Sequence, residues 1–390
     1  RLHCMSTHPA RRRQLRTWTP ADRQEHLQAV ATGVEQGSKN SPELLDLASN
    51  DYLSLCRHPA LIAAAESQLR CSGLGSGGSR LVSGSRPVHV QLESELARWL
   101  GRERVLLFPS GFQANLAAVC VLANRHTTVL ADRLIHHSLL VGVQASGARL
   151  RRFSHNDLGS LERLLLRSRS ERPQAPLLVI SESLFSMEGT SPPVQDLAAL
   201  CERHGARLLL DEAHALGVLG EGGRGLGFGE DGVTLLSGTL GKAFGSGGAF
   251  LACDSELGEK LLQGSGAFRY TTALAPPLAA GALAALELMQ ANPDWGQRLV
   301  ERSENWRARL VEAGWARPTG RGPILPLIVG DDQHCLNLQH QLEHSGLLTA
   351  AIRPPTVPEG SARLRLVLHR CLPDETLESL LRALRDARLA

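Results

Sequence analysis

Lysine is scarce in this sequence of 390 residues. Lys and Arg together number 42, but lysine occurs only at Lys39, Lys242 and Lys260. Chemistry that requires a primary amine, such as Schiff-base formation, therefore has very few candidate residues. The residues around each lysine therefore help to indicate whether that lysine is functional.

Paired cysteines are absent as well. The eight cysteines stand singly and form no Cys-x-x-Cys motif. This spacing argues against a disulfide framework and against a zinc site. We expect a protein of the reducing cytoplasm that binds no metal.

Long hydrophobic runs are missing too. No apolar run approaches the ~20 residues that a membrane-spanning helix needs, and residues 1–13 lack the apolar core of a signal peptide. We interpret residues 1–13 as a basic arm in which Met5 is a candidate start. No membrane partner is expected.

Neither sign of charge dominates the chain. The 42 basic residues stand against 39 Asp and Glu residues, for a net charge of +3. This balance provides no reason to expect a nucleic acid or an anionic surface as a partner. The composition favours a protein that acts on small molecules.

The chain is long enough for one large domain and a smaller one. It is 43% hydrophobic and 21% charged, as ordinary globular proteins are. Short apolar runs alternate with amphipathic segments, which predicts an α/β fold with a mostly parallel central sheet flanked by helices. We expect an N-terminal arm at 1–48, a large domain at 49–288 and a small C-terminal α+β domain at 289–390.

The apolar pattern also places individual elements. The strands expected in the large domain are 105–108, 128–131, 177–180, 207–210 and 233–236. The helices expected there are 61–69, 92–100, 112–123, 196–204 and 278–289. Asp196 is the expected N-cap of one helix, and Gly101 is the expected C-terminal cap of another. The small domain is expected to hold strands at 324–329 and 363–369 and helices near 333–345 and 373–389.

Two glycine-rich segments have the letters of nucleotide-binding loops but not the context. Gly73-Leu-Gly-Ser-Gly-Gly78 fits G-x-G-x-x-G, yet a predicted helix rather than a strand precedes it. Gly241-Lys242 is followed by Ala243, where a P-loop has Ser or Thr. A dinucleotide-dependent oxidoreductase is therefore a weak alternative. We expect the segment 73–78 to admit a substrate or a neighbouring subunit.

Lys242 and Asp211 each follow a predicted buried strand, at the sheet edge where open α/β proteins bind ligands. Partial desolvation there would lower the pKa of an amine and free it for Schiff-base chemistry, although a surface lysine is the commoner case. Asp211 could pair with a pyridinium nitrogen or simply cap a helix. His214, three residues further on, could reach the same ring. Together these residues favour a pyridoxal phosphate site.

Three other sites are weaker when taken singly. Ser110-Gly111-Phe112 lies between a strand and a helix, so its N–H groups could hold a phosphate or merely form a tight turn. His136 follows another strand, although a lone histidine is more often structural. Arg353 lies in a proline-stiffened loop that suits bidentate capture of a carboxylate, but an exposed loop arginine is the commoner case.

Taken in order, these residues resemble the α-oxoamine synthases, pyridoxal phosphate enzymes of the aspartate-aminotransferase fold type. The resemblance runs from residue 47 nearly to the C-terminus. The motifs that carry it are Leu47-Ala-Ser-Asn-Asp-Tyr-Leu53, Gly75-Ser-Gly-Gly-Ser-Arg80, Val82-Ser-Gly84, Ser110-Gly-Phe-Gln-Ala-Asn115, Glu182-Ser-Leu-Phe-Ser-Met-Glu-Gly189, Asp211-Glu-Ala-His214, Thr239-Leu-Gly-Lys242 and Tyr270-Thr-Thr272.

The resemblance implies roles around the cofactor ring. Lys242 would carry pyridoxal 5'-phosphate as a covalent Schiff base, and Asp211 would face the pyridine nitrogen. His214 and Ser186 would address the phenolic oxygen, and His136 would stack on the ring.

The resemblance also implies a phosphate site shared between the subunits of a homodimer. The residues that would hold the cofactor and its phosphate are Gly111, Phe112 and Thr239. Thr271 and Thr272 would reach the phosphate bound by the partner subunit.

By the same resemblance, four residues would bind substrate. Arg353 would bind the carboxylate of the amino acid, Thr356 would lie beside the substrate, and Asn50 would line the amino-acid pocket. His136 would donate a hydrogen bond to the thioester carbonyl. Relatives also use an N-terminal arginine, for which the arginines of the segment 11–16 are the candidates.

The family joins an amino acid to an acyl thioester with loss of carbon dioxide, and Lys242 would remove the Cα proton. The loop Ile352-Arg-Pro-Pro-Thr-Val-Pro358 is similar to that of members that condense L-alanine with pimeloyl-CoA or pimeloyl-ACP in biotin biosynthesis. Another α-oxoamine synthase activity, such as that of glycine C-acetyltransferase, and a non-catalytic family member are the alternatives. Ile135 departs from the pattern, because many relatives have Asn there.

Overall fold

The computed structural model describes residues 9–23, 25–30 and 43–389, so Met5 lies outside the described residues. The chain forms two compact units. Unit 1 comprises residues 1–54, 186–189 and 298–390, and unit 2 comprises residues 55–185 and 190–297. The sequence predicts domain boundaries near residues 48 and 288. These boundaries stay a prediction.

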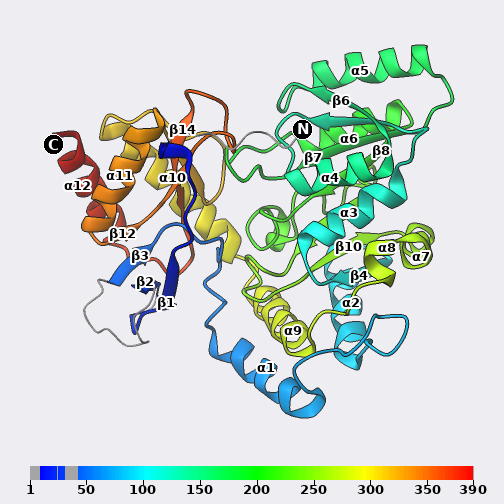
Figure 1. Ribbon diagram of the computed structural model, residues 1–390, viewed down its shortest axis with the longest axis horizontal. Coiled ribbons are helices and arrows are strands. Elements are labelled where there is room, and N and C mark those ends of the chain that lie inside the picture. The colour runs from blue at the N-terminus through cyan, green and yellow to red at the C-terminus, as the bar shows by residue number, and fades with distance from the viewer. Residues whose placement is uncertain (1–8, 24, 31–42, 390) are drawn as a thin grey trace. The chain divides into compact units, whose positions relative to one another are not determined.

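A seven-stranded sheet runs through unit 2 (Figure 1). Its strand order is β4-β10-β9-β8-β7-β5-β6. Neighbouring strands from β9 to β6 are parallel, and β10 is antiparallel to both β4 and β9. The strands are β4 (Arg104–Phe108), β5 (Thr128–Asp132), β6 (Arg149–Phe153), β7 (Leu177–Glu182), β8 (Arg207–Asp211), β9 (Leu235–Thr239) and β10 (Ala249–Cys253). The predicted α/β fold with a mostly parallel sheet is therefore confirmed.

Helices cover this sheet because its inner strands are apolar on both faces. Every residue of β5, β7 and β10 is buried, as expected of strands packed between two helical layers. The helices and helical turns of unit 2 are α1 (Pro59–Ser72), α2 (Pro87–Leu100), α3 (Gly111–Leu122), α4 (His137–Ser146), α5 (Leu158–Glu171), α6 (Val194–Arg203), η2 (Glu221–Gly223), α7 (Ser255–Gly264), α8 (Gly266–Arg269) and α9 (Pro276–Ala291).

Two local predictions in unit 2 were wrong. Helix α6 begins at Val194 with Pro193 at its N-cap, so Asp196 is not the cap. It lies in the first turn instead, where its charge favours the positive end of the helix dipole. Strand β9 begins at Leu235 rather than Val233, because Val233 belongs to the turn closed by its N–H bond to the carbonyl of Glu230. Gly101 does end α2 in the left-handed conformation, as predicted.

Unit 1 holds two smaller sheets. One has the order β1-β2-β3-β12 and the other β11-β14-β13. Their strands are β1 (Thr17–Pro20), β2 (His26–Val30), β3 (Glu43–Asp46), β11 (Ile324–Gly330), β12 (Leu347–Leu348), β13 (Ala350–Ile352) and β14 (Ala362–Val367). The helices are η1 (Pro9–Arg11), α11 (Asp332–His344), α12 (Thr376–Leu389) and the part of α10 (Trp295–Glu312) from Arg298 onward. The arm expected at 1–48 contains strands β1, β2 and β3, which the sequence did not predict, since main-chain pairing needs no apolar pattern.

The carboxyl ends of β5, β7, β8 and β9 meet at one edge of the unit 2 sheet, because these strands are parallel neighbours. Several predicted site residues follow these ends directly. Among the residues that the structure describes, no helix is long and apolar enough to cross a membrane.

Candidate active site

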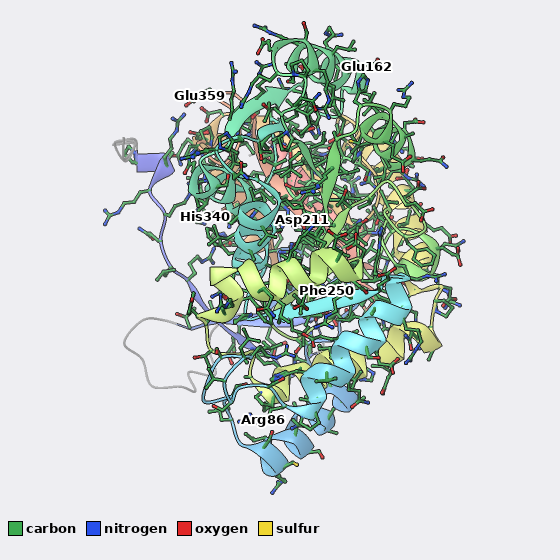
Figure 2. The ribbon with its side chains drawn as sticks, turned by 90° about the vertical axis from the view of Figure 1, so that its right-hand side faces the viewer. Arg86, Glu162, Asp211, Phe250, His340 and Glu359 are labelled. Atoms are coloured by element: carbon green, nitrogen blue, oxygen red, sulfur yellow. The ribbon has the colours of Figure 1, made fainter. Side chains whose placement is uncertain are left out.

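Asp211 ends β8 and is held in one orientation by Asn115 of α3. The Asn115 amide Nδ2 donates to Asp211 Oδ2 at 2.8 Å, and Ser237 Oγ donates to Asn115 Oδ1 at 2.6 Å. The Ala213 backbone N–H donates to the other carboxylate oxygen at 2.9 Å. Asp211, which Figure 2 labels, is only 5% exposed. The Asp211 carboxylate is therefore prepositioned by residues from three elements.

Lys242 lies in a tight turn after β9. The turn is closed by the bond from the Gly245 N–H to the Lys242 carbonyl at 2.8 Å. Gly245 has a φ of +60°, and a Cβ there would overlap the backbone nitrogen of Cys56. Only glycine suits this position, so the glycine-rich sequence around Lys242 serves a close backbone approach.

His136 is the N-cap of α4 and shares its surroundings with Lys242. Burial lowers the pKa of His136, and the ammonium of Lys242 lowers it further, while Asp211 acts in the opposite direction. The His136 ring is therefore neutral near pH 7. The backbone N–H of Ser138 donates to its Nδ1 at 3.3 Å, so the proton of the neutral ring resides on Nε2. His136 can then act as a hydrogen-bond donor through Nε2.

Glu182 is a site residue to which the sequence assigned no role. It ends β7, is 4% exposed, and its Oε1 accepts the backbone N–H of His136 at 2.5 Å. Burial and the neighbouring Asp211 raise the pKa of Glu182 well above its usual value, while the Lys242 ammonium opposes this. Its sequence signal resembled that of Asp211, an acidic residue at the end of a buried strand.

His214 and Glu212 lie in the turn that follows Asp211. Both are buried. The Gly227 N–H donates to Glu212 Oε1 at 2.6 Å, and the Leu226 N–H donates to Oε2 at 3.3 Å. Burial raises the pKa of Glu212 to about 7. Glu212 thus ties the turn that carries Asp211 and His214 to the glycine-rich loop at 225–227.

The N-terminus of α3 is suited to a phosphate group. Ser110 caps the helix by accepting the Gln113 N–H at 3.3 Å. A side chain at Gly111 would meet nothing within 4 Å, so open space lies beside the first turn of the helix. Helix N-termini bind phosphate through their N–H groups and the helix dipole. Phe112 is half exposed at the same end.

The threonines expected near the phosphate differ in their surroundings. Thr239 Oγ1 donates to the Gly248 carbonyl at 3.2 Å. Thr271 Oγ1 accepts from the Gln113 side chain of the same chain at 3.1 Å, and Thr272 is exposed. The role of Thr271 and Thr272 toward a partner subunit stays a prediction.

The remaining predicted site residues belong to unit 1, and Arg365 connects two of them. The Arg365 guanidinium donates to Asn50 Oδ1 at 2.7 Å and to the Ser186 carbonyl at 2.6 Å. Tyr52 Oη also lies 3.3 Å from Asn50 Oδ1. Because Asn50 Oδ1 accepts these bonds, the Asn50 NH₂ group is the end that can donate to a ligand. Arg365 was missed, and its signal was an arginine between two leucines of the predicted strand 363–369.

Arg353 is buried, and the N-terminal segment contacts it. Its Nη1 donates to the Ala10 carbonyl, and Arg13 Nη2 donates to the Arg353 carbonyl at 3.0 Å. Burial and the nearby Arg13 lower the pKa of the Arg353 guanidinium. Thr356 follows in the same loop and is exposed.

The N-terminal arginines of unit 1 fall into two groups. Arg11 forms ion pairs with Asp332 at 2.6 Å and with Glu359. Three others line a cavity of about 610 Å³ together with Arg353, namely Arg12, Arg13 and Arg16. Arg11 is therefore engaged in structural pairs, and Arg16 likewise pairs with Glu343 at 2.6 Å. Arg12 and Arg13 are the better candidates for an anionic ligand.

Pyridoxal phosphate fits the donors present in unit 2. An amine, a buried carboxylate and a neutral imidazole share one site, and a helix N-terminus with open space beside it suits the phosphate. Lys242, Asp211 and His136 would hold the ring, and the first turn of α3 would hold the phosphate.

Comparison with known proteins shows the family of this chain. Residues 42–384 match the family "Aminotransferase class I and II". A curated 8-amino-7-oxononanoate synthase of Chromohalobacter salexigens is 44% identical over 87% of this chain and 88% of its own length. Two solved structures share the fold. A serine palmitoyltransferase of Sphingomonas wittichii has a TM-score of 0.89 with 28% identity over 95% of this chain and 91% of that one. An 8-amino-7-oxononanoate synthase of Francisella tularensis has a TM-score of 0.75 with 27% identity over 88% and 96%.

The fold and site thus define a pyridoxal phosphate-dependent transferase of the class I and II aminotransferase family. Within this class, the chain belongs to the 8-amino-7-oxononanoate synthases, which are acyltransferases of biotin biosynthesis. The expected resemblance and the expected cofactor are confirmed. The roles of individual site residues stay predictions.

Proposed function

We propose that the protein condenses L-alanine with a pimeloyl thioester to yield 8-amino-7-oxononanoate, carbon dioxide and the free thiol of coenzyme A or acyl carrier protein. A bond forms between the alanine Cα and the thioester carbonyl carbon. The C–S bond breaks, the alanine carboxylate leaves as carbon dioxide, and a proton returns to Cα. The relatives that match at 42–44% identity are 8-amino-7-oxononanoate synthases, which supports this reaction.

Pyridoxal phosphate, when bound, supplies an electron sink that makes the alanine Cα acidic. Lys242 Nζ would hold the cofactor aldehyde and later take the Cα proton. Its place among His136, Glu182 and Asp211 supports this role, because buried neighbours tune the basicity of an amine. Asp211 would stay fixed toward the ring nitrogen through its bond to Asn115.

His136 would donate from Nε2 to the thioester carbonyl and stack on the ring. The lowered pKa of His136 and its accepting Nδ1 support a neutral donor ring. His214 and Ser186 would hydrogen-bond the phenolic oxygen. Gly111, Phe112 and Thr239 would hold the phosphate end.

Arg353 would bind the alanine carboxylate, Asn50 would donate to the amino acid from its NH₂ group, and Thr356 would lie beside the substrate. The buried guanidinium of Arg353 and the accepting Oδ1 of Asn50 support these roles. Arg365, which already contacts Asn50, is a second candidate for the carboxylate.

A homodimer with shared active sites would complete the phosphate site. Two large apolar side chains beside Thr271 and Thr272 are strongly exposed, Val82 at 83% and Tyr270 at 80%. A cavity of about 410 Å³ lies between Ser79–Val82 and Arg269–Thr272. An exposed apolar patch of this kind supports an interface with a second copy.

The seven described cysteines are free thiols, which supports a location in the reducing cytoplasm.

The grouping of Lys242, His136 and Asp211 around one buried site is the observation that carries this proposal. The test is the visible spectrum of the purified protein with pyridoxal phosphate, followed by L-alanine or glycine, and then pimeloyl-CoA or pimeloyl-ACP with an assay for free thiol. A band that responds to alanine and thiol release with a pimeloyl thioester would support the proposal. A response to glycine with thiol release from acetyl-CoA would point to glycine C-acetyltransferase activity. A protein that stays colourless would point to a non-catalytic family member.

A further inference from the structure

A buried carboxylate at the end of β5 accepts four hydrogen-bond contacts. Asp132 is 0% exposed. Its Oδ1 accepts the Leu134 N–H at 2.9 Å and its Oδ2 accepts the Asn156 N–H at 2.8 Å. The Nδ1 of His155 lies 3.1 Å from both carboxylate oxygens. Since two backbone donors already face this carboxylate, it acts as an acceptor and His155 Nδ1 carries a proton.

The other nitrogen of His155 faces two polar side chains. Its Nε2 lies 2.7 Å from Thr190 Oγ1 and 3.3 Å from Asn156 Nδ2. The result is an Asp–His–hydroxyl chain, Asp132–His155–Thr190, in which Nδ1 faces the carboxylate and Nε2 faces the hydroxyl.

This chain ends at the base of the segment that carries Ser186. The chain leaves unit 2 after Phe185 and returns to it at Thr190. The Phe185 N–H donates to the Thr190 carbonyl at 2.9 Å, which closes the loop at its base. The His155 ring meets the Phe185 ring edge-on, with centroids 4.4 Å apart. His155 therefore contacts the residues at both ends of the loop 186–189.

The same carboxylate also orders the segment that leads to His136. The Leu134 N–H bond to Asp132 fixes the turn two residues before His136. Asp132 thus supports the segment before His136 directly, and it supports the loop 186–189 through His155. The sequence singled out neither Asp132 nor His155, and the active-site roles described above do not use them.

We propose that His155 is a positioning residue, which sets the place of Ser186 by fixing Phe185 and Thr190 at the base of its loop, with Asp132 holding the orientation of the imidazole. This inference rests on the proposed function, in which Ser186 hydrogen-bonds the cofactor. His155 and Thr190 touch neither substrate nor cofactor in this account. Their effect on the reaction passes through Ser186.

The first test needs no cofactor. Nitrogen NMR of the histidine rings in cofactor-free protein, assigned with His155→Gln, is expected to show a proton on His155 Nδ1, which faces both Asp132 oxygens. In Thr190→Val the Nε2 resonance is expected to move, because its hydroxyl partner is lost. A His155 ring protonated at Nε2 alone would overturn the inference.

The second test uses the loaded enzyme and a matched pair of variants. Thr190→Val keeps the shape of the side chain and removes the hydroxyl, whereas Thr190→Ser keeps the hydroxyl. We expect Thr190→Val to lower kcat roughly tenfold, with both KM values within about twofold, since a small misplacement of a site group has effects of this order. It should also shift the visible band of the bound cofactor in the same direction as Ser186→Ala. Thr190→Ser should restore both.

Ser186→Ala serves as the background that separates positioning from general destabilisation. In that background Thr190→Val is expected to add no further loss of kcat, because the effects of substitutions that act through the same group are not additive. Additive losses, or equal behaviour of Thr190→Val and Thr190→Ser, would overturn the inference. Lys242→Ala tests the proposed function separately: if it keeps the band and turnover, the proposed function itself fails, whatever the Thr190 variants do.

Discussion

Glu182 holds His136 across two neighbouring strands of the unit 2 sheet. Glu182 ends β7, and its Oε1 accepts the backbone N–H of His136, four residues past the end of β5, at 2.5 Å. This bond fixes the entry of the chain into α4, where His136 is the N-cap. The buried carboxyl group of Glu182 therefore positions the backbone of His136, which is the residue proposed to donate a hydrogen bond to the thioester carbonyl.

Glu182→Gln is expected to retain most activity, because the amide oxygen can still accept the His136 N–H. Glu182→Ala is expected to lower kcat about tenfold and to cost about 1–3 kcal/mol of stability, since it orphans a largely buried donor. Steady-state kinetics and urea unfolding would measure both. Equal activity of the two variants would contradict the positioning role of Glu182.

Lys242→Ala is expected to abolish the visible cofactor band and to lower turnover at least 10³-fold, because the amine that holds the aldehyde and moves the proton is lost. The fold should persist, as shown by an unchanged circular dichroism spectrum. Lys260→Ala is the matched control, because Lys260 is an exposed lysine paired with Glu256 on α7. Full activity of Lys242→Ala would refute the assigned mechanism.

Arg353→Ala is expected to raise the KM for L-alanine about tenfold or more and to leave the KM for the pimeloyl thioester nearly unchanged, because a charged hydrogen bond to the carboxylate is lost. Arg365→Ala is the comparison, since Arg365 contacts Asn50. A rise confined to the thioester KM would show that Arg353 binds the other substrate. A large effect on alanine from Arg365→Ala alone would move the carboxylate role to Arg365.

Glu212 is expected to make stability depend on pH. Burial raises the pKa of Glu212 to about 7 in the folded protein, against the ordinary value of 4.5 for an exposed glutamate. The folded state therefore binds more protons than the unfolded state between these values, so the Glu212 contribution to stability falls as pH rises from about 4.5 to 7. The fall is about 3 kcal/mol. Urea unfolding of wild type and Glu212→Gln across this range would measure it, and parallel pH curves for the two proteins would rule it out.

Much of unit 2 could be predicted because its signals are local. The apolar strands from 105 to 210 were located within two residues, and Lys242 and Asp211 drew attention through their immediate neighbours in sequence. Strand β6 was not predicted, because three of its five residues are arginines. Strand β10 was not predicted either, because a short apolar run fits a buried helix segment as well as a strand. Strands β1 and β2 were missed because backbone pairing, such as that of Trp18 with Ala29, leaves no side-chain pattern in the sequence.

The site residues that escaped prediction share one property, which is a partner far away in sequence. Asn115 reaches Asp211 across 96 residues, and Arg365 reaches Asn50 across 315. No pattern within a window of a few turns can contain such a pair. The motif containing Asn115 and the carboxylate of Asp211 were both noticed, but the hydrogen bond between them was not.

The sequence by itself determined which kinds of chemistry this protein can perform. Three features could be recognised in the linear sequence, since each depends on adjacent residues. They are a single lysine in a glycine-rich segment after a buried strand, an acid at the end of the preceding strand, and a helix start suited to phosphate. Only the tertiary structure decided which groups act together and in which protonation state. Burial and neighbouring charges set the pKa values of His136, Glu182 and Glu212, and those neighbours come from other strands.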